Sequence, residues 1–106
     1  MYTNNVFIAI INNQQESLIS DFSIDLNKLT KKTICISAED FDEFDNKIEH
    51  NFEVSFLNAK NIDIEENVFD ENDNEFFIFK FSLNEDIYEL HFPIKYLSFF
   101  KTIINY

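Results

Sequence analysis

Carboxylates are the side chains of this sequence with the most obvious chemistry. The 106 residues include 20 Asp and Glu against eight Lys and no Arg, and the formal net charge is −12. Two carboxylates can share general acid–base catalysis when one is kept protonated in an apolar pocket beside an ionised one. The acidic residues here instead form dense polar runs, where solvated and ionised carboxylates are expected. We therefore predict no catalytic carboxylate pair and no enzymatic activity.

One short motif suggests calcium. Asp70-x-Asn72-x-Asn74 matches the first three ligand positions of a calcium-binding loop. The match then ends, because Glu75 stands where glycine makes the sharp turn and Phe81 stands where a bidentate glutamate belongs. We predict an exposed acidic turn and no metal site.

Histidine, cysteine and glycine exclude other kinds of site. His50 and His91 are the only histidines, and they lack the short spacing of common metal motifs. The single cysteine, Cys35, excludes an internal disulfide, and its apolar neighbours predict a small buried side chain. The sequence has no glycine, which excludes phosphate-binding loops and a glycine-flanked nucleophile elbow. We expect neither a cofactor nor a catalytic residue.

The surplus negative charge is confined to the middle of the chain. The flanks 1–38 and 76–106 each balance three acidic residues with three lysines. The segment between them has only Lys47 and Lys60 as bases and holds fourteen carboxylates: Glu39, Asp40, Asp42, Glu43, Asp45, Glu49, Glu53, Asp63, Glu65, Glu66, Asp70, Glu71, Asp73 and Glu75. We predict that these side chains form one acidic surface. The negative field and the lack of arginine exclude direct binding of nucleic acid.

The elements that would position these residues can be read from hydrophobic periodicity. Apolar runs and alternating residues predict strands at Val6–Ile11, 22–26, 34–37, 52–56 and 62–64. The segment 14–20 is compatible with a short helix or with part of the strand at 22–26. Asn12-Asn13, residues 72–74 and Asn84 are the expected turns, since Asn and Asp best replace glycine in left-handed conformations.

A helix is predicted over residues 38–49. Ser37 can cap its first turn, where the acidic residues that follow are also favoured. Phe41, Phe44 and Ile48 recur at helical spacing and would form its buried stripe. Carboxylates three or four positions apart on such a helix lie roughly 5–6 Å apart, comparable to the phosphates of a nucleic-acid strand.

The last third of the chain predicts a hairpin, 76–92, that turns at Asn84-Glu85. In this register Phe81 faces Tyr88, Phe79 faces Leu90 and Phe77 faces Phe92 on one side of the sheet. Lys80 then meets Glu89 on the other side, and a slip of one residue would expose the aromatic set.

A C-terminal helix is predicted after Pro93, which suits a first helical turn. The fold class is therefore α+β, a single domain with a small antiparallel sheet of about five or six strands and one or two helices packed on a face. The apolar stripe of residues 93–106 is wide, so a homodimer through this helix is a further expectation. No stretch is long enough to span a bilayer, so no membrane contact is expected. We expect the cytoplasm, that of an infected host if the chain is encoded by a phage or virus.

Two resemblances bear on function. The small size and the carboxylate-rich middle segment are similar in character to nucleic-acid-mimicking inhibitors, including anti-CRISPR proteins and the immunity proteins of nuclease toxins. The stretch from Phe76 to Pro93 resembles the closing hairpin of the SspB adaptors, which deliver tagged peptides to a protease. The glycines usual in that hairpin are absent, and the likeness covers only the last third of the chain.

Three interpretations follow. The first is a non-enzymatic inhibitor whose acidic surface imitates nucleic acid and binds a basic protein, such as a nuclease or a CRISPR effector. The second is an adaptor that binds a peptide at a sheet edge, with the acidic residues serving only solubility. The third is a structural subunit that assembles through the C-terminal helix.

Overall fold

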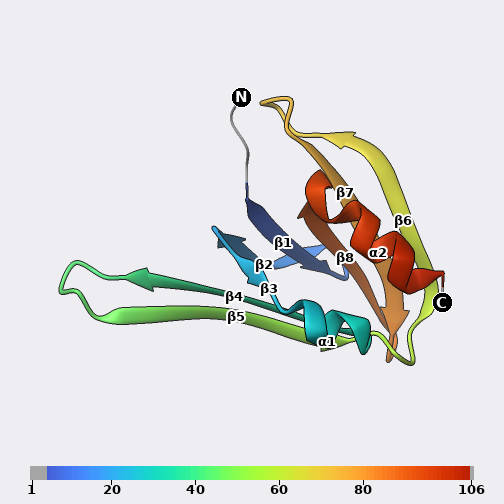
Figure 1. Cartoon of the computed structure of the whole chain (residues 1–106), viewed down its shortest axis with the longest axis horizontal. Helices are drawn as coiled ribbons and strands as arrows, with labels where there is room; N and C mark the ends of the chain where they lie inside the picture. Colours follow the sequence, from blue (N-terminus) through green and yellow to red (C-terminus); the bar gives the residue numbers. More distant parts are fainter. Residues whose placement is uncertain (1–4, 106) are drawn as a thin grey trace.

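The computed structural model describes residues 5–105, which fold into two antiparallel sheets and a few short helices (Figure 1). The larger sheet has the strand order β2-β1-β8-β7-β6, and the smaller has the order β3-β4-β5. The larger sheet contains β1 (Val6–Ile11), β2 (Gln14–Ser20), β6 (Lys60–Phe69), β7 (Glu75–Leu83) and β8 (Asp86–Pro93). The smaller contains β3 (Ser23–Ile24), β4 (Thr33–Phe41) and β5 (Lys47–Ser55). The helices are α1 (Leu26–Thr30) and α2 (Leu97–Ile104), with the 3-10 turn η1 (Ile94–Tyr96) before α2. The predicted α+β class is confirmed.

The C-terminal hairpin is confirmed in the predicted register. Strands β7 and β8 pair Phe77 with Phe92, Phe79 with Leu90 and Phe81 with Tyr88, and they place Lys80 opposite Glu89. The two turn residues have φ values of 51° and 73°, as a two-residue type I′ loop requires. Aromatic alternation therefore set the register without help from a glycine turn.

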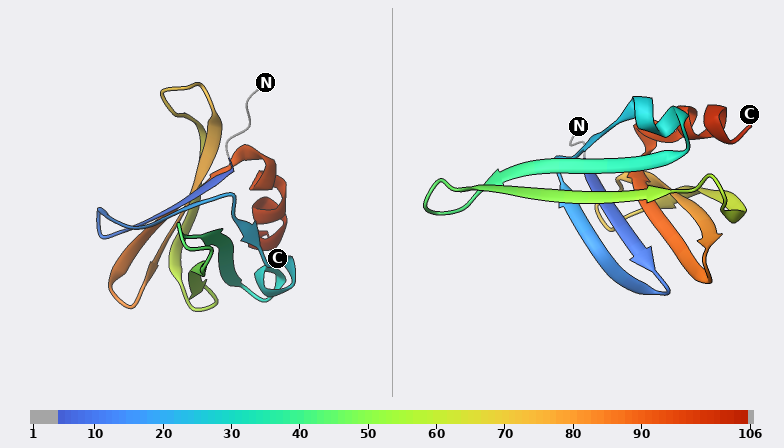
Figure 2. Two further views of the ribbon diagram at one scale, coloured as in Figure 1. Left: turned by 90° about the vertical axis from the view of Figure 1, so that its left-hand side faces the viewer. Right: turned by 90° about the horizontal axis from the view of Figure 1, so that it is seen from below.

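The core lies between the concave face of the larger sheet, helix α2 and the inner part of the smaller sheet (Figures 1 and 2). Phe100 of α2 is fully buried, and its ring centroid lies 4.7 Å from that of Phe92. Phe7 of β1 is also fully buried and lies 5.2 Å from Phe52 of β5. Phenyl rings thus join all three layers.

Asn and Asp take the positions that glycine would normally fill. Among the described residues, ten have positive φ, and eight of these are Asn or Asp. They include the predicted turns at Asn12-Asn13 and Asn84, together with Asp73 in the 72–74 turn. Left-handed conformations are least unfavourable for Asn and Asp among residues that carry a Cβ.

The segment from residue 14 to residue 30 differs from the sequence expectation in two places. Residues 14–20 form a strand of their own, β2, which lies in the larger sheet and is separate from β3 in the smaller one. The strand predicted over 22–26 is reduced to the two residues of β3, because Asp25 caps helix α1. Its carboxylate accepts a hydrogen bond from the backbone N–H of Lys28 at 3.0 Å.

The helix predicted over residues 38–49 is wrong. These residues belong to β4, a tight turn and β5, which pair continuously from Thr33 opposite Ser55 to Phe41 opposite Lys47. Ile34 and Ile36 are fully buried and fix the pleat of β4, so the strand extends outward past Ser37 where a helix cap was expected. Tertiary strand pairing here outweighs the local capping signal.

No helix among residues 5–105 combines the length and apolar character needed to cross a membrane.

Candidate functional site

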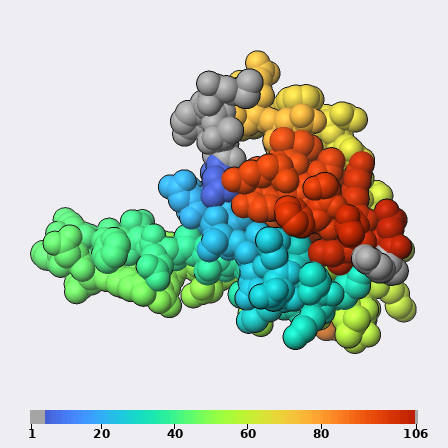
Figure 3. Space-filling view, viewed as in Figure 1, coloured from blue at the N-terminus to red at the C-terminus, as the bar shows by residue number. Residues whose placement is uncertain are grey.

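The outer part of the β4–β5 hairpin projects from the body as a separate arm. We define the arm as residues 39–50, and none of these side chains is buried. The molecule measures 44 × 31 × 28 Å, and the arm extends along the longest axis (Figures 1 and 3). In the space-filling view it stands clear of the other elements on the side shown. Both faces of this ribbon are therefore open to a partner.

The arm is anchored by its inner end. Ile34 and Ile36 of β4 are fully buried, while Phe52 and Val54 of β5, paired with them, are half-buried. Beyond Ala38 and His50 the two strands contact little but each other. An isolated two-stranded hairpin is only marginally stable in water, so the sheet and core behind it must hold the arm in place.

A network of backbone hydrogen bonds closes the apex. The carboxylate of Asp42 accepts bonds from the backbone N–H groups of Phe44 at 2.8 Å and Asn46 at 2.9 Å. The N–H of Asp42 donates to the carbonyl of Asn46, and Asp45 follows with a φ of 60°. This is a three-residue hairpin loop that ends in a left-handed residue. Asp42 and Asp45 therefore hold the loop.

The bonds at Asp42 predict a pH dependence of the apex. The N–H groups of Asn46 and then Phe44 favour the ionised carboxylate and lower its pKa below the ordinary value. A depressed pKa means that the loop gains stability above the unfolded-state pKa and loses it as pH falls through the folded-state pKa. A carbon-detected NMR titration should find that the pKa of Asp42 lies below the ordinary value of an aspartate.

The Asp42→Asn variant is the control for this titration. Its amide oxygen still accepts a hydrogen bond but does not titrate, so the changes of the Phe44 and Asn46 amides that follow the protonation of Asp42 should disappear. An Asp42 midpoint at or above the ordinary aspartate value would contradict the bonding described here.

The arm is strongly acidic. Its six carboxylates are accompanied by one lysine, a formal net charge of −5. Lys47 bridges Glu39 at 2.9 Å and Glu49 at 3.3 Å, which otherwise stand directly opposite each other as like charges. These exposed pairs contribute little stability. The ion pairs of Lys47 allow the carboxylates of Glu39 and Glu49 to lie close together. Glu43 and Asp45 extend the negative charge around the apex.

The predicted acidic residues outside the arm lie on other elements, so the prediction of one acidic surface is wrong. The structure divides the fourteen predicted binding residues among three places. Six are on the arm: Glu39, Asp40, Asp42, Glu43, Asp45 and Glu49. Seven lie on β6, in the β6–β7 turn or at the start of β7: Asp63, Glu65, Glu66, Asp70, Glu71, Asp73 and Glu75. The last, Glu53, is on the inner part of β5. Figure 1 places the arm at the left, the β6–β7 turn at the top and β6 at the right.

The β6 group is partly neutralised by lysines from other elements. Lys80 of β7 contacts Glu65 at 2.6 Å, and Lys101 of α2 contacts Glu66 at 3.0 Å. Glu53 likewise pairs with Lys28 at 3.3 Å. The arm receives no ion pair from outside its own strands among those the structure records for residues 5–105. The charge of the arm is therefore more available to a partner than the charge of the β6 group.

The arm apex and the β6–β7 turn are two copies of one motif. Residues 41–46 read F-D-E-F-D-N and residues 69–74 read F-D-E-N-D-N, identical at five of six positions. Asp70 accepts bonds from the N–H groups of Asn72 and Asn74, as Asp42 does from Phe44 and Asn46. This repeat was not predicted, although the sequence shows it. The turn expected at 72–74 would then have identified 41–46 as a turn as well.

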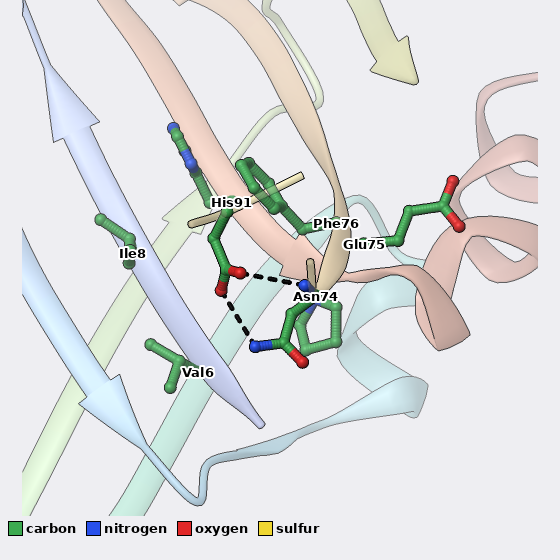
Figure 4. Close-up of a pocket in the computed structure, with 8 residues that line it drawn as sticks. Val6, Ile8, Asn74, Glu75, Phe76 and His91 are labelled. Carbon is green, nitrogen blue, oxygen red and sulfur yellow. Dashed lines mark hydrogen bonds between the residues drawn. The ribbon is translucent and has the colours of Figure 1, made fainter. Parts of the chain in front are cut away.

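The two histidines do not form a site. His50 is exposed on the arm, whereas the ring of His91 stacks on Phe76 at 5.4 Å. Partial burial lowers the pKa of His91, against an opposing effect of Glu89. His91 lines a pocket of about 120 Å³ with Val6 and Ile8 (Figure 4). Within the described part of the chain, no three His, Cys, Asp or Glu side chains are arranged to hold a metal ion.

Cys35 is less buried than its apolar neighbours suggested. It lies on the outer face of β4, beside Glu53 and with its Sγ 4.0 Å from the Nζ of Lys28. Partial burial and the nearby carboxylate raise the pKa of the thiol, which lowers the thiolate fraction. The expected unreactive role thus fits the electrostatics, although the side chain is only half-buried.

Helix α2 uses much of its apolar stripe within the molecule. Phe100 and Ile103 are buried against the core, while Phe99 is 45% exposed. The homodimer through residues 93–106 stays a prediction, and less apolar surface is free for it than the sequence suggested.

Comparisons with protein-family models, with curated proteins and with solved structures found no match. The charge and the exposure of the arm set it apart from the rest of the fold.

Proposed function

We propose that the protein is a non-enzymatic inhibitor that binds a basic nucleic-acid-binding protein, such as a nuclease or a CRISPR effector, by imitating nucleic-acid charge. One observation carries the proposal: a narrow ribbon with six carboxylates and one lysine projects clear of the folded body. A ribbon of this form can enter a cationic groove without unfolding or rearranging the core.

The spacing of charge on the arm supports this proposal. Glu39 and Glu49 stand directly opposite each other on the paired strands, where Cβ atoms lie about 4.5–5.5 Å apart, a separation comparable to that of successive phosphates. A concentrated negative field also steers a cationic partner and raises the rate of association. In the complex, lysines and arginines of the groove would pair with Glu39, Glu43 and Glu49 in place of phosphates.

The adaptor alternative has less support from the two edges of the larger sheet, β6 and β2. A peptide that adds a strand needs a regular, open edge. The pairing of β6 with β7 shifts register twice, and Asn61 and Asn67 take left-handed conformations in these irregular stretches. Such bulges discourage strand addition. At the opposite edge, the pairing of β2 with β1 also shifts once, between Ala9 and Ile10.

Charge reversal on the arm tests the proposal. The variant Asp40→Lys, Glu43→Lys, Glu49→Lys should weaken partner binding by about 100-fold or more, because each reversal turns attraction into repulsion. Asp42 and Asp45 are left unchanged, since they hold the loop. Affinity is measured by capturing proteins from host lysate at low salt, purifying the partner and titrating it.

The matched control moves the same charge change to the β6 group, as Asp63→Lys, Glu71→Lys, Glu75→Lys. It alters the net charge of the protein equally and should bind nearly as the wild type does. Wild-type affinity should also fall as salt is raised. Equal losses in the two variants, or binding that ignores salt, would contradict a specific role for the arm.

A further inference from the structure

Phe44, at the apex of the arm, is an exposed aromatic side chain that the fold does not require. Its exposed fraction is 75%, against 66% for Leu57, the next among the exposed large apolar side chains. In the sequence it was expected to be part of a buried helical stripe. A phenyl ring held this far from the core stays exposed to water, so it gains no free energy from burial and contributes little to folding.

The second copy of the turn shows that this position accepts a polar residue. Asn72 occupies the place of Phe44 in the 69–74 motif, and the hydrogen bonds that close the loop are equivalent. Phe41 and Phe69 begin the two motifs and have similar exposed fractions, 61% and 57%. Phe44 is therefore the only residue of the motif by which the apex of the arm differs from the β6–β7 turn.

The neighbours of Phe44 define the kind of surface that would receive it. Glu43 and Asp45 flank it in sequence, so the ring enters a partner together with negative charge. A complementary site has an apolar or aromatic floor and a cationic rim. Channels for single-stranded nucleic acid have this composition, since they combine a basic groove with aromatic platforms on which bases stack.

The exposed ring of Phe44 favours the same class of channel. A duplex keeps its base faces stacked inside, so no exposed ring is needed to imitate them. The bases of a single strand are unstacked and stack instead on aromatic side chains of the channel.

We propose that the arm imitates single-stranded nucleic acid, with Phe44 taking the place of an unstacked base and the flanking carboxylates taking the place of phosphates. The inference rests on the proposed function and specifies its partner as a protein with a single-strand channel. Aromatic or arginine side chains of that channel would stack on the Phe44 ring.

The repeated turn supplies the test variant. Phe44→Asn converts the apex into D-E-N-D-N, a sequence that already forms this loop at residues 70–74. Phe69→Asn is the matched control, because it removes a similarly exposed phenyl beside the other acidic turn. Neither variant alters the net charge, and amide NMR spectra check that each keeps the fold.

Two synthetic peptides of equal charge are the first probes, one alternating Lys with Trp and one alternating Lys with Ala. Wild type and Phe69→Asn should bind the Trp peptide about tenfold more tightly, with shifts at the arm amides. Phe44→Asn should bind both peptides equally. An unchanged preference in Phe44→Asn, or no preference in the wild type, would overturn the role of Phe44.

Competition on the purified partner then separates this inference from the proposed function. A 20-nucleotide thymidine oligomer should displace the protein, while a 20-base-pair duplex at the same nucleotide concentration should not. Displacement by the duplex alone, or by both equally, overturns the single-strand assignment and leaves the inhibitor intact. Failure of the arm charge reversal to weaken binding overturns the proposed function, and this inference with it.

Discussion

Phe100→Ala should lower the free energy of unfolding by about 3–5 kcal/mol, the usual cost of deleting a buried phenyl ring. Phe100 is fully buried where helix α2 meets the larger sheet. Its ring lies 4.7 Å from Phe92, 5.1 Å from Phe79 and 5.3 Å from Phe77. A domain of this size has a total stability of about 5–15 kcal/mol, so the variant should be marginal at room temperature.

Urea unfolding followed by circular dichroism measures this loss, and Phe99→Ala is the neighbouring control. Phe99 lies in the same helix but is 45% exposed, so its removal should cost less than about 1 kcal/mol. Similar losses for the two variants would mean that α2 does not pack on the sheet through Phe100 as described.

Removal of the arm should abolish partner binding while the body stays folded. A two-residue Asn-Gly turn that replaces residues 39–49 would join Ala38 to His50, which already pair across β4 and β5. The deletion removes all six arm carboxylates and Phe44 but no buried side chain. Unfolding free energy should therefore change by less than about 1 kcal/mol.

Urea unfolding and titration of the purified partner test the two halves of this prediction. The matched variant shortens the other copy of the turn, replacing residues 70–74 by Asn-Gly, and should keep its affinity for the partner. Wild-type affinity after loss of the arm would place the binding surface on the body. A large loss of stability would mean that the arm supports the core.

The sequence predicted best where burial repeats with a fixed period. Phe77, Phe79 and Phe81 can all face the core only in a strand, and their partners in β8 fix one register. Several residues close together in the sequence impose this constraint, so the residue pairs of the hairpin could be predicted correctly. The absence of glycine likewise made Asn and Asp the expected turn residues.

The arm could not be predicted from hydrophobic periodicity, because its outer residues lack contacts with the core and their side chains do not alternate between buried and exposed. Ser37 and the spacing of Phe41, Phe44 and Ile48 favour a helix if that stripe is buried. In the structure these three side chains are exposed. The arm continues the inner part of the hairpin, whose direction is fixed by the burial of Ile34 and Ile36.

Proximity in sequence also failed to predict proximity in space for the acidic residues. Residues 39–49 and 63–75 are separated by one inner strand and a short connection, yet the chain runs back along the body before β6 begins. Only the six arm carboxylates stay together on one projecting element. The function proposed from composition therefore now depends on that element and no longer on a shared surface.

The most direct test of the proposal is competition for the nucleic-acid site of the purified partner. A fluorescent single-stranded oligonucleotide is bound to the partner, and its anisotropy is followed as the protein is added. We predict that wild-type protein releases the oligonucleotide fully, with a midpoint that rises with salt, and that the arm-deleted protein releases none. A ternary complex, in which the protein binds while the oligonucleotide stays bound, would contradict the proposal.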